Sequence, residues 1–322
     1  MRKVKFAMMI LAASLLTACG SSKKEQSVNE ETAAARTQET ENLLANLKKI
    51  PSKGIMLGHH DDTVYGIGWE GRSDVKSVCG DYPAVISFDL GELELGNAAN
   101  LDKVPFDKIR KEIINQYQRG GMVSLSWHAR NPKTGGDAWD VSDTTVVKSI
   151  LPGGENHQKF AGWLGGVADF LHSLKTADGV KIPVLFRPWH EHSGSWFWWG
   201  EKLCTPEEYK ALWHMTVDTL QAKGVDNALY AYSPGTEPKD TTEYLKKYPG
   251  DELIDVIGFD TYQFDRDAYL AGMDRALSII DSVGKAHNKE FPMPNGGLVL
   301  CCLRWRNIRL PMCWCGAMPV KR

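Results

Sequence analysis

The sequence has almost no excess of charge of either sign. Its 322 residues include 38 Lys and Arg against 40 Asp and Glu, for a formal net charge of −2. Proteins that bind nucleic acid through its phosphates usually carry a clear basic excess, so this balance gives no indication of a nucleic-acid partner. The apolar run at residues 7–16, AMMILAASLL, is also too short to span a bilayer, for which about 20 residues are needed.

That short apolar run is typical of a secretion signal. The basic segment MRKVKF precedes it, and the small-residue segment LTACG follows it. The Leu-Thr-Ala-Cys ending resembles a bacterial lipobox, so we predict a lipoprotein signal over residues 1–19 with lipid on Cys19; a conventional signal peptide is the alternative. Residues 20–38 are polar and lack aromatic side chains, which predicts a flexible tether. We therefore expect a secreted lipoprotein of the bacterial cell envelope, outer-membrane or periplasm-facing, whose membrane partner is reached through Cys19.

From about residue 39, short apolar runs alternate with amphipathic segments, a pattern that indicates a parallel α/β protein. No glycine-rich turn follows the first predicted strand, as a dinucleotide-binding fold would require. Active sites of (β/α)₈ barrels lie at the C-terminal ends of the strands, where polar side chains gather here. We therefore predict a (β/α)₈ TIM barrel over residues 39–290. The predicted strands are 54–60, 83–90, 122–128, 182–191, 228–234 and 253–262, and their ends carry His59, Asp89, His128, Glu191, Tyr232 and Asp260.

Tryptophan is unusually frequent, with eleven in the chain and four of them in the segment RPWHEHSGSWFWWG, residues 187–200. A flat indole ring can stack on the apolar face of a pyranose, so this composition indicates sugar binding. The same segment places Glu191 directly after an apolar strand. A general acid for glycosidic-bond cleavage must be protonated at the working pH, and Trp189 and Trp196 could provide the apolar setting that this requires. A purely structural ion pair between Glu191 and Arg187 is the alternative.

The segment at 187–200 closely resembles the acid/base segment of glycoside hydrolase family 26, a clan A family of retaining hydrolases whose commonest activity is endo-β-1,4-mannanase. The segments GIMLGHHDD, SFDLGELE, VSLSWHARNP, YAYSP and IGFDTYQ extend the resemblance over roughly residues 40–290. It implies a barrel without a cofactor that cleaves β-1,4-mannosidic bonds in mannan, galactomannan or glucomannan. The alternatives are a β-glucanase or β-xylanase on the same scaffold, and a non-catalytic glycan-binding lipoprotein.

The resemblance assigns roles to individual residues at the predicted strand ends. Glu191 matches the general acid/base. His190 and Trp196 match residues that contact sugar near the cleavage point. His128 matches a histidine of the −1 subsite, with a neutral core histidine as the alternative. These matches imply a sugar site at the ends of the third and fourth strands.

Further matches extend this predicted site. Asp260 and Tyr262 match a pair near the reaction centre, in which the Tyr hydroxyl hydrogen-bonds the nucleophile. We expect Trp139 to form another sugar platform, with simple surface packing as the alternative. The His-His-Asp-Asp run at residues 59–62 could suggest a metal, but no further ligands follow at metal spacing. The sequence therefore predicts a polar strand end there, and no metal site.

The second carboxylate of a retaining mechanism is missing from the printed sequence. Such a mechanism needs two carboxyl groups about 5–5.5 Å apart, and the resemblance places the nucleophilic Glu on the seventh strand. No Asp or Glu follows Glu290, and Glu290 itself precedes the position of that strand. The predicted barrel thus has an acid/base and no nucleophile.

Residues 291–322 have no helical or strand period, and they hold four of the seven cysteines. Residues 302–321, CLRWRNIRLPMCWCGAMPVK, can be translated back into codons, with a free choice among synonymous codons. If each codon is then started one base earlier, one permitted set of choices encodes LPTLAEYPLAYVLVWRNARE. This segment includes a predicted buried strand and the family's Trp-Arg-Asn. We therefore hypothesise that the reading frame shifts near Phe291 and that the aberrant tail lacks the seventh and eighth strands; a naturally divergent terminus is the alternative. Six strands would leave two open sheet edges, so we expect poor solubility and little or no hydrolysis.

Overall fold

A computed structural model describes residues 35–50, 56–64, 72–262, 265–289, 302–303 and 312–313. All of these residues belong to one compact unit, residues 33–322. The predicted signal with Cys19 lies outside the described residues, as do most of the predicted tether and most of the predicted tail. Within the described part of the chain, no helix combines the length and the apolar character that crossing a membrane requires.

Six parallel strands form one sheet, and their order in the sheet is their order in the chain. Each strand pairs in parallel with the next, so that Val85, for example, lies opposite both Gly58 and Met122. Sequential parallel strands joined by helical connections are the arrangement of a (β/α) barrel, and the described residues contain six of its eight strands. The strands are β1 (Gly58–His60), β2 (Val85–Asp89), β3 (Met122–Ser126), β4 (Val184–Arg187), β5 (Ala228–Tyr232) and β6 (Val256–Ile257).

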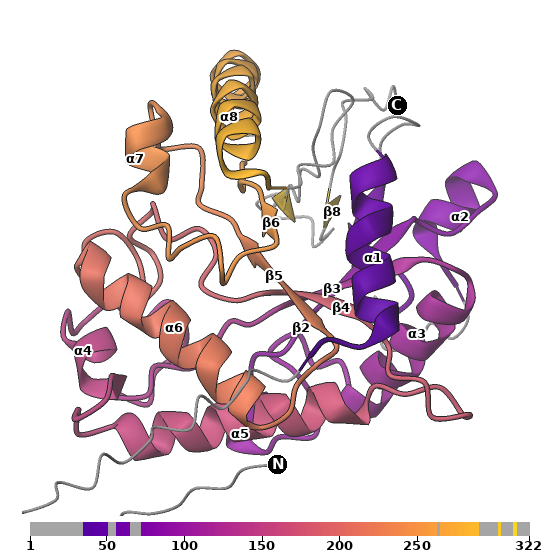
Figure 1. The fold of residues 1–322 in the computed structure, drawn as a ribbon, viewed down its shortest axis with the longest axis horizontal. Helices are drawn as coiled ribbons and strands as arrows, with labels where there is room; N and C mark the ends of the chain where they lie inside the picture. Colours follow the sequence, from indigo (N-terminus) through magenta and orange to yellow (C-terminus); the bar gives the residue numbers. More distant parts are fainter. Residues whose placement is uncertain are drawn as a thin grey trace, which may run out of the picture. The chain divides into compact units, whose positions relative to one another are not determined.

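Helices surround this sheet (Figure 1). The long helices begin where the sequence has start signals; α6, for example, follows a capping box in which the side chains of Thr205 and Glu208 accept each other's backbone N–H groups. The sequence did not predict the short helices α2, α4 and α7, because five or six residues are too few to show a helical period. The helices are α1 (Gln38–Lys49), α2 (Asp74–Cys79), α3 (Phe106–Gln118), α4 (Val146–Ile150), α5 (His157–Ser173), α6 (Pro206–Ala222), α7 (Thr241–Leu245) and α8 (Arg266–His287), with a 3₁₀ turn η2 (Leu93–Leu95).

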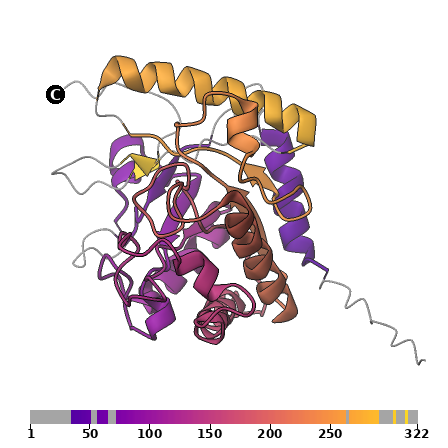
Figure 2. The ribbon, with the colours of Figure 1, turned by 90° about the vertical axis from the view of Figure 1, so that its left-hand side faces the viewer.

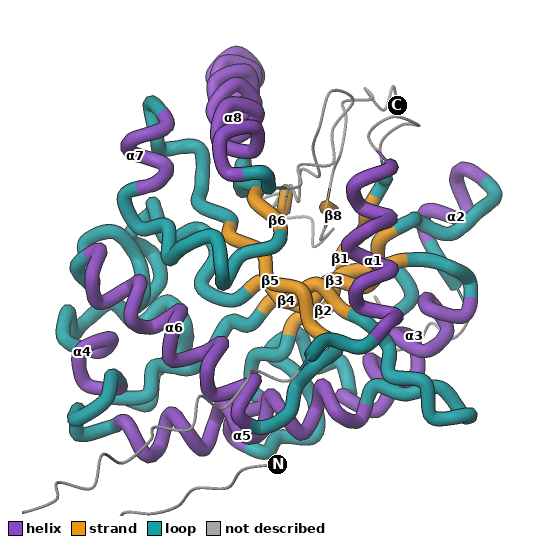
Figure 3. Tube along the Cα trace, in the orientation of Figure 1, coloured by secondary structure: helices purple, strands orange, loops and turns teal. Residues whose placement is uncertain are grey.

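Alternate strand residues belong to two separate apolar cores, as the period of two in a strand requires. One set packs among the outer helices, where Ile86 and Phe186 are fully buried. The other set packs against α1, whose Leu47 is fully buried. Figure 3 shows α1 beside the strands of the sheet. The second core thus covers one end of the sheet and leaves the carboxyl ends of the strands to the polar residues. It consists of Leu47, Val85, Met122, Leu185, Leu229, Ala231 and Val256.

The last elements of the chain add no strand to the parallel sheet within the described residues. Helix α8 runs at a steep angle to α6 (Figure 2). After it, β7 (Cys302–Leu303) and β8 (Met312–Cys313) pair antiparallel and form a small sheet of their own. The predicted lack of a seventh and an eighth barrel strand concerns residues 291–322, most of which lie outside the described part of the chain.

Candidate active site

The predicted site residues gather at the carboxyl ends of the parallel strands. Strand β4 ends at Arg187, and the turn after it presents His190 and Glu191. Within this turn, Trp189 and Glu191 have positive φ angles of 53° and 56°. Non-glycine residues in this region are strained, and such strain is common where a chain must present functional groups. The backbone N–H of Glu191 donates to Ser233 O at 2.7 Å, which ties the turn to the end of β5.

Three of the four tryptophans in this segment hold the turn rather than face a ligand. Trp189, Trp198 and Trp199 are fully buried. The indole N–H of Trp198 donates to Ala129 O at 2.9 Å, and that of Trp199 donates to His190 O at 2.8 Å. Trp196 is the one that is half-buried. The high tryptophan content thus mainly builds the rigid support of the site.

Glu191 is the central carboxylate of the site and is only 3% exposed. Its Oε2 accepts a hydrogen bond from the indole N–H of Trp196 at 2.8 Å, and its Oε1 accepts one from the Tyr262 hydroxyl. The resemblance assigns that hydroxyl to the nucleophile, whereas here it binds the predicted acid/base. The alternative partner for Glu191 was Arg187, but the Arg187 guanidinium forms its ion pair with Asp260 at 2.8 Å.

Asp260 follows β6 and is almost fully buried. Its Oδ2 accepts hydrogen bonds from Arg187 Nη1 at 2.8 Å and from Ser233 Oγ at 2.5 Å. Burial raises the pKa of Asp260 to about 7; the Arg187 charge opposes this increase, and the nearby Glu191 adds to it. Because its oxygen is engaged by two donors, Asp260 holds Arg187 and Ser233 in place.

A chain of hydrogen bonds links Asp89 at the end of β2 to two imidazoles. Asp89 Oδ2 lies 2.6 Å from His128 Nδ1, and His128 Nε2 lies 3.2 Å from His190 Nε2. Burial alone would raise the pKa of Asp89, but His128 and hydrogen bonds from Ser126 and Gly91 hold it well below its usual range. The carboxylate therefore accepts from an Nδ1–H on His128. His128 Nε2 is then left as the acceptor for an Nε2–H on His190.

Burial keeps the second imidazole of this chain neutral. Desolvation, followed by the charge of Arg187, lowers the pKa of His190 well below its usual value. A neutral ring can hydrogen-bond a sugar hydroxyl without bringing a charge beside the acid/base. His190 thus enters the site with a defined tautomer and no charge.

Aromatic rings complete the surroundings of these histidines. Trp139 stacks on His128 with ring centroids 5.1 Å apart and an interplanar angle of 14°. Phe197 contacts His128 edge-on at 5.2 Å, and Trp196 lies edge-on to Tyr262 at 6.4 Å. Six of the seven predicted site residues from 128 to 262 therefore contact another of the seven, and Asp260 instead contacts Arg187 and Ser233.

Sequence reasoning missed several residues that hold this arrangement. It placed Asp89 at a strand end without a role, and it did not select Ser233 or Phe197. Their partners lie on other strands, and no spacing along the chain shows such pairing. A cue was available only for Asp89, a buried carboxylate after an apolar strand, which normally requires partners.

Comparisons with known proteins agree with this architecture. The model of glycosyl hydrolase family 26 matches residues 32–287. A solved GH26 β-mannanase from Bacteroides ovatus is 60% identical with a TM-score of 0.79, and the match covers 83% of this chain and 77% of that one. This similarity confirms the predicted TIM-barrel class.

Curated relatives are similar over most of the chain. A mannan endo-1,4-beta-mannosidase of Bifidobacterium adolescentis is 40% identical over 241 residues, which is 72% of this chain but only 24% of that protein. One from Bacillus subtilis is 29% identical over 262 residues, which is 77% of this chain and 69% of the relative. On the family match and these similarities, the chain belongs to glycosyl hydrolase family 26.

Proposed function

We propose that this chain is built to cleave β-1,4-mannosidic bonds in mannan, galactomannan or glucomannan with retention of configuration. The supporting observation is the placement of Glu191 between the indole N–H of Trp196 and the Tyr262 hydroxyl, beside neutral His190. The similar proteins from Bifidobacterium adolescentis and Bacillus subtilis are named as mannan endo-1,4-beta-mannosidases, which supports the choice of mannan over glucan or xylan.

Glu191 is the proposed acid/base. It gives its proton to the bridging oxygen of the glycosidic bond as that bond breaks, and it later takes a proton from the water that releases the sugar. Trp196 and Tyr262 hold one carboxyl oxygen each, so the group cannot rotate away from the bond. When the bridging oxygen approaches one of these oxygens, the donor on that oxygen must give way.

The sugar rings are proposed to lie beside His128, His190 and the partly buried rings of Trp139 and Trp196. A hydroxyl of the ring that reacts takes the place of the contact between His128 Nε2 and His190 Nε2, and the two indoles support the apolar faces of neighbouring sugar rings. Because Trp139 stacks on His128, a sugar on Trp139 would adjoin the one at His128. This arrangement suits a chain of linked sugars rather than a single one.

The nucleophile is the part of the reaction that the printed chain does not supply. Asp260 is an unsuitable substitute, because Arg187 and Ser233 already hold its Oδ2. No Asp or Glu follows Glu290 in the printed sequence. We therefore propose that the chain as printed binds mannan and hydrolyses it far more slowly than a form in which the reading frame near Phe291 is restored.

Release of reducing sugar from galactomannan and glucomannan tests this proposal in the printed chain and in a frame-restored form, with lichenan and xylan as comparison substrates. Hydrolysis of mannan only after restoration supports the proposal. In the restored form, Glu191→Gln should lower kcat by about 10²–10⁴. Undiminished hydrolysis by Glu191→Gln would refute the role of Glu191. Binding of mannan without hydrolysis in both forms would instead indicate a glycan-binding protein.

We also propose that the protein is a lipoprotein of the bacterial envelope, with lipid on Cys19. The support is the Leu-Thr-Ala-Cys sequence after a basic and an apolar segment. Metabolic labelling with a radioactive fatty acid should mark the full chain and leave a Cys19→Ala variant unmarked. Equal labelling of the two forms would contradict the proposal.

A further inference from the structure

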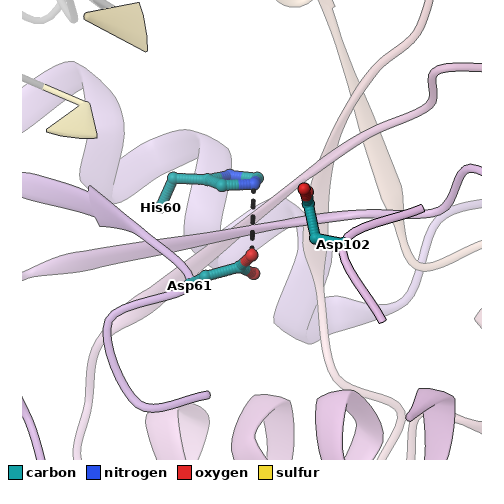
Figure 4. Close-up of side chains that lie close together, drawn as sticks. All are labelled: His60, Asp61 and Asp102. Atoms are coloured by element: carbon teal, nitrogen blue, oxygen red, sulfur yellow. Dashed lines mark ion pairs between the residues drawn. The ribbon is translucent and has the colours of Figure 1, made fainter. Parts of the chain in front are cut away.

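Three possible metal ligands meet beside the proposed active site. His60 ends β1, Asp61 follows it, and Asp102 lies in the loop between β2 and α3. One ligand atom from each of the three lies within 4.8 Å of the others. Figure 4 shows the His60 ring next to the Asp61 carboxylate, with Asp102 entering from a separate segment of the chain.

The backbone brings the two neighbouring side chains to the same side. Successive side chains in a strand point to opposite faces, so His60 and Asp61 would normally diverge. Asp61 instead has a positive φ of 56°, which turns the chain at the end of β1. As a result, His60 Nε2 and Asp61 Oδ2 lie 3.5 Å apart.

The third carboxylate is held in position by a buried asparagine. Asn100 Nδ2 donates to Asp89 O at 3.1 Å, which ties the loop to the end of β2. Asn100 Oδ1 accepts from the backbone N–H groups of Asp102 and Val104, both at 3.0 Å. Asp102 therefore sits on an ordered turn, with its own side chain exposed.

Asp61 supplies an independent indication of a ligand. The residue is only 3% exposed, and its Oδ1 has no hydrogen-bond partner among the described residues. A buried carboxylate oxygen without a partner is costly and rare in native proteins. The Asp102 carboxylate and the His60 imidazole nitrogen lie next to this carboxylate, and a cation held with them would give Asp61 the partner that its Oδ1 lacks.

We propose that His60, Asp61 and Asp102 bind one divalent transition-metal cation of the Zn²⁺ or Mn²⁺ type. Zn²⁺ binds imidazole nitrogen and carboxylate oxygen at about 2.0–2.2 Å, so two ligand atoms of a tetrahedral site lie roughly 3.3–3.5 Å apart. The His60–Asp61 distance of 3.5 Å already has this value. A mixed nitrogen and oxygen donor set favours these ions over Ca²⁺ and Mg²⁺, which prefer oxygen alone.

The cation ties β1 to the loop between β2 and α3. This loop also contacts the Asp89 end of the hydrogen-bonded histidine chain through Asn100. The site is therefore a positioning device that stabilises one wall of the proposed active site. It requires neither mannan nor the absent nucleophile, so its test does not depend on the proposed function.

Calorimetric titration of the chelator-treated full chain with Zn²⁺ tests the proposal. We expect one site that is weakened at least tenfold by Asp102→Asn and by Asp61→Asn. Asp102 is exposed, so its substitution leaves folding intact even if Asp61→Asn does not fold. The matched control is Asp178→Asn, another aspartate in an exposed turn, which should bind Zn²⁺ like the parent chain.

Zn²⁺ could also bind to the cysteines of the tail. The titration is therefore repeated with Mn²⁺, which thiolates bind poorly, and Mn²⁺ binding is followed by water-proton relaxation. Saturating Zn²⁺ should also raise the Tm of the parent chain more than that of Asp102→Asn, since an ion bound only to the folded state stabilises it. The proposal is overturned if Asp102→Asn binds both ions as tightly as the parent chain does, or if the parent chain binds neither.

Discussion

Replacing Asp89 by Asn should reverse the proton positions on both histidines of the proposed sugar site. Asp89 Oδ1 accepts from Gly91 N at 2.7 Å and from His128 N at 3.3 Å. Its Oδ2 accepts from Ser126 Oγ and His128 Nδ1, both at 2.6 Å. In the Asp89→Asn variant the two backbone N–H groups keep the amide oxygen on their side, so the amide NH₂ takes the Oδ2 position. An NH₂ group cannot accept from an Nδ1–H.

The imidazoles must then change tautomer in sequence. His128 becomes an acceptor at Nδ1 and carries its proton on Nε2, which faces His190 Nε2 at 3.2 Å. His190 must in turn accept at Nε2 and carry its proton on Nδ1. Both histidines therefore present the opposite hydrogen-bonding pattern to a sugar, and binding of mannan oligosaccharides should weaken even though both rings stay in place.

The expected loss of stability follows from the same contacts. Hydrogen bonds to an ionised carboxylate contribute roughly 1.5–3 kcal/mol each and neutral ones about 1, while the amide side chain avoids the cost of burying a charge. We expect a net destabilisation of about 2–3 kcal/mol. In a protein of this size that corresponds to a decrease in Tm of about 3–6 °C, measurable by calorimetry.

The effect of pH has a defined sign. The pKa of Asp89 is lower in the folded state than in the unfolded state, so its stabilising contribution is complete above the unfolded pKa of about 3.9 and is lost as the pH falls below it. The difference in stability between the parent chain and Asp89→Asn should therefore be largest near neutral pH and shrink as the pH falls below about 4.

Ser126→Ala is the matched control, because it removes one donor to Asp89 and leaves the tautomers unchanged. Nitrogen-15 chemical shifts of the imidazoles report the tautomers directly. The reasoning is refuted if Asp89→Asn leaves both tautomers as they are in the parent chain, or if its Tm falls no further than that of Ser126→Ala.

Three further substitutions test other parts of the structure. Arg187→Met should lower the free energy of unfolding in urea by about 3–5 kcal/mol, because it leaves buried Asp260 without its ion-pair partner. Adding Asp260→Asn should recover much of that loss. A single variant as stable as the double variant would contradict this. Thr205→Ala removes the cap of α6 and should cost about 1 kcal/mol in thermal unfolding, whereas Thr205→Ser should not; equal losses would exclude the capping role. Trp139→Ala should weaken calorimetric binding of a mannan oligosaccharide about 3–10-fold, and unchanged affinity would remove Trp139 from the sugar site.

Local patterns in the sequence were sufficient to predict the parallel α/β architecture and the segment that presents Glu191. Apolar runs with a period of two and helices with a period of 3.6 are properties of neighbouring residues, so they are readable without a structure. Helix α6 shows this well, because its Thr205 cap and its Pro206 start lie within the helix's own sequence. The placement of polar side chains at strand ends similarly indicated where the site would form.

Only the tertiary structure decided which of those polar groups became partners. Arg187 bonds to Asp260 rather than to Glu191, and the Tyr262 hydroxyl reaches Glu191 in place of a nucleophile. The fold also brings a ligand atom of Asp102 within 4.8 Å of ligand atoms of His60 and Asp61, although the sequence shows no further ligand at metal spacing. Such pairs come from different strands and loops, and their distances depend on how the sheet brings remote segments together. Spacing along one chain carries no record of that approach.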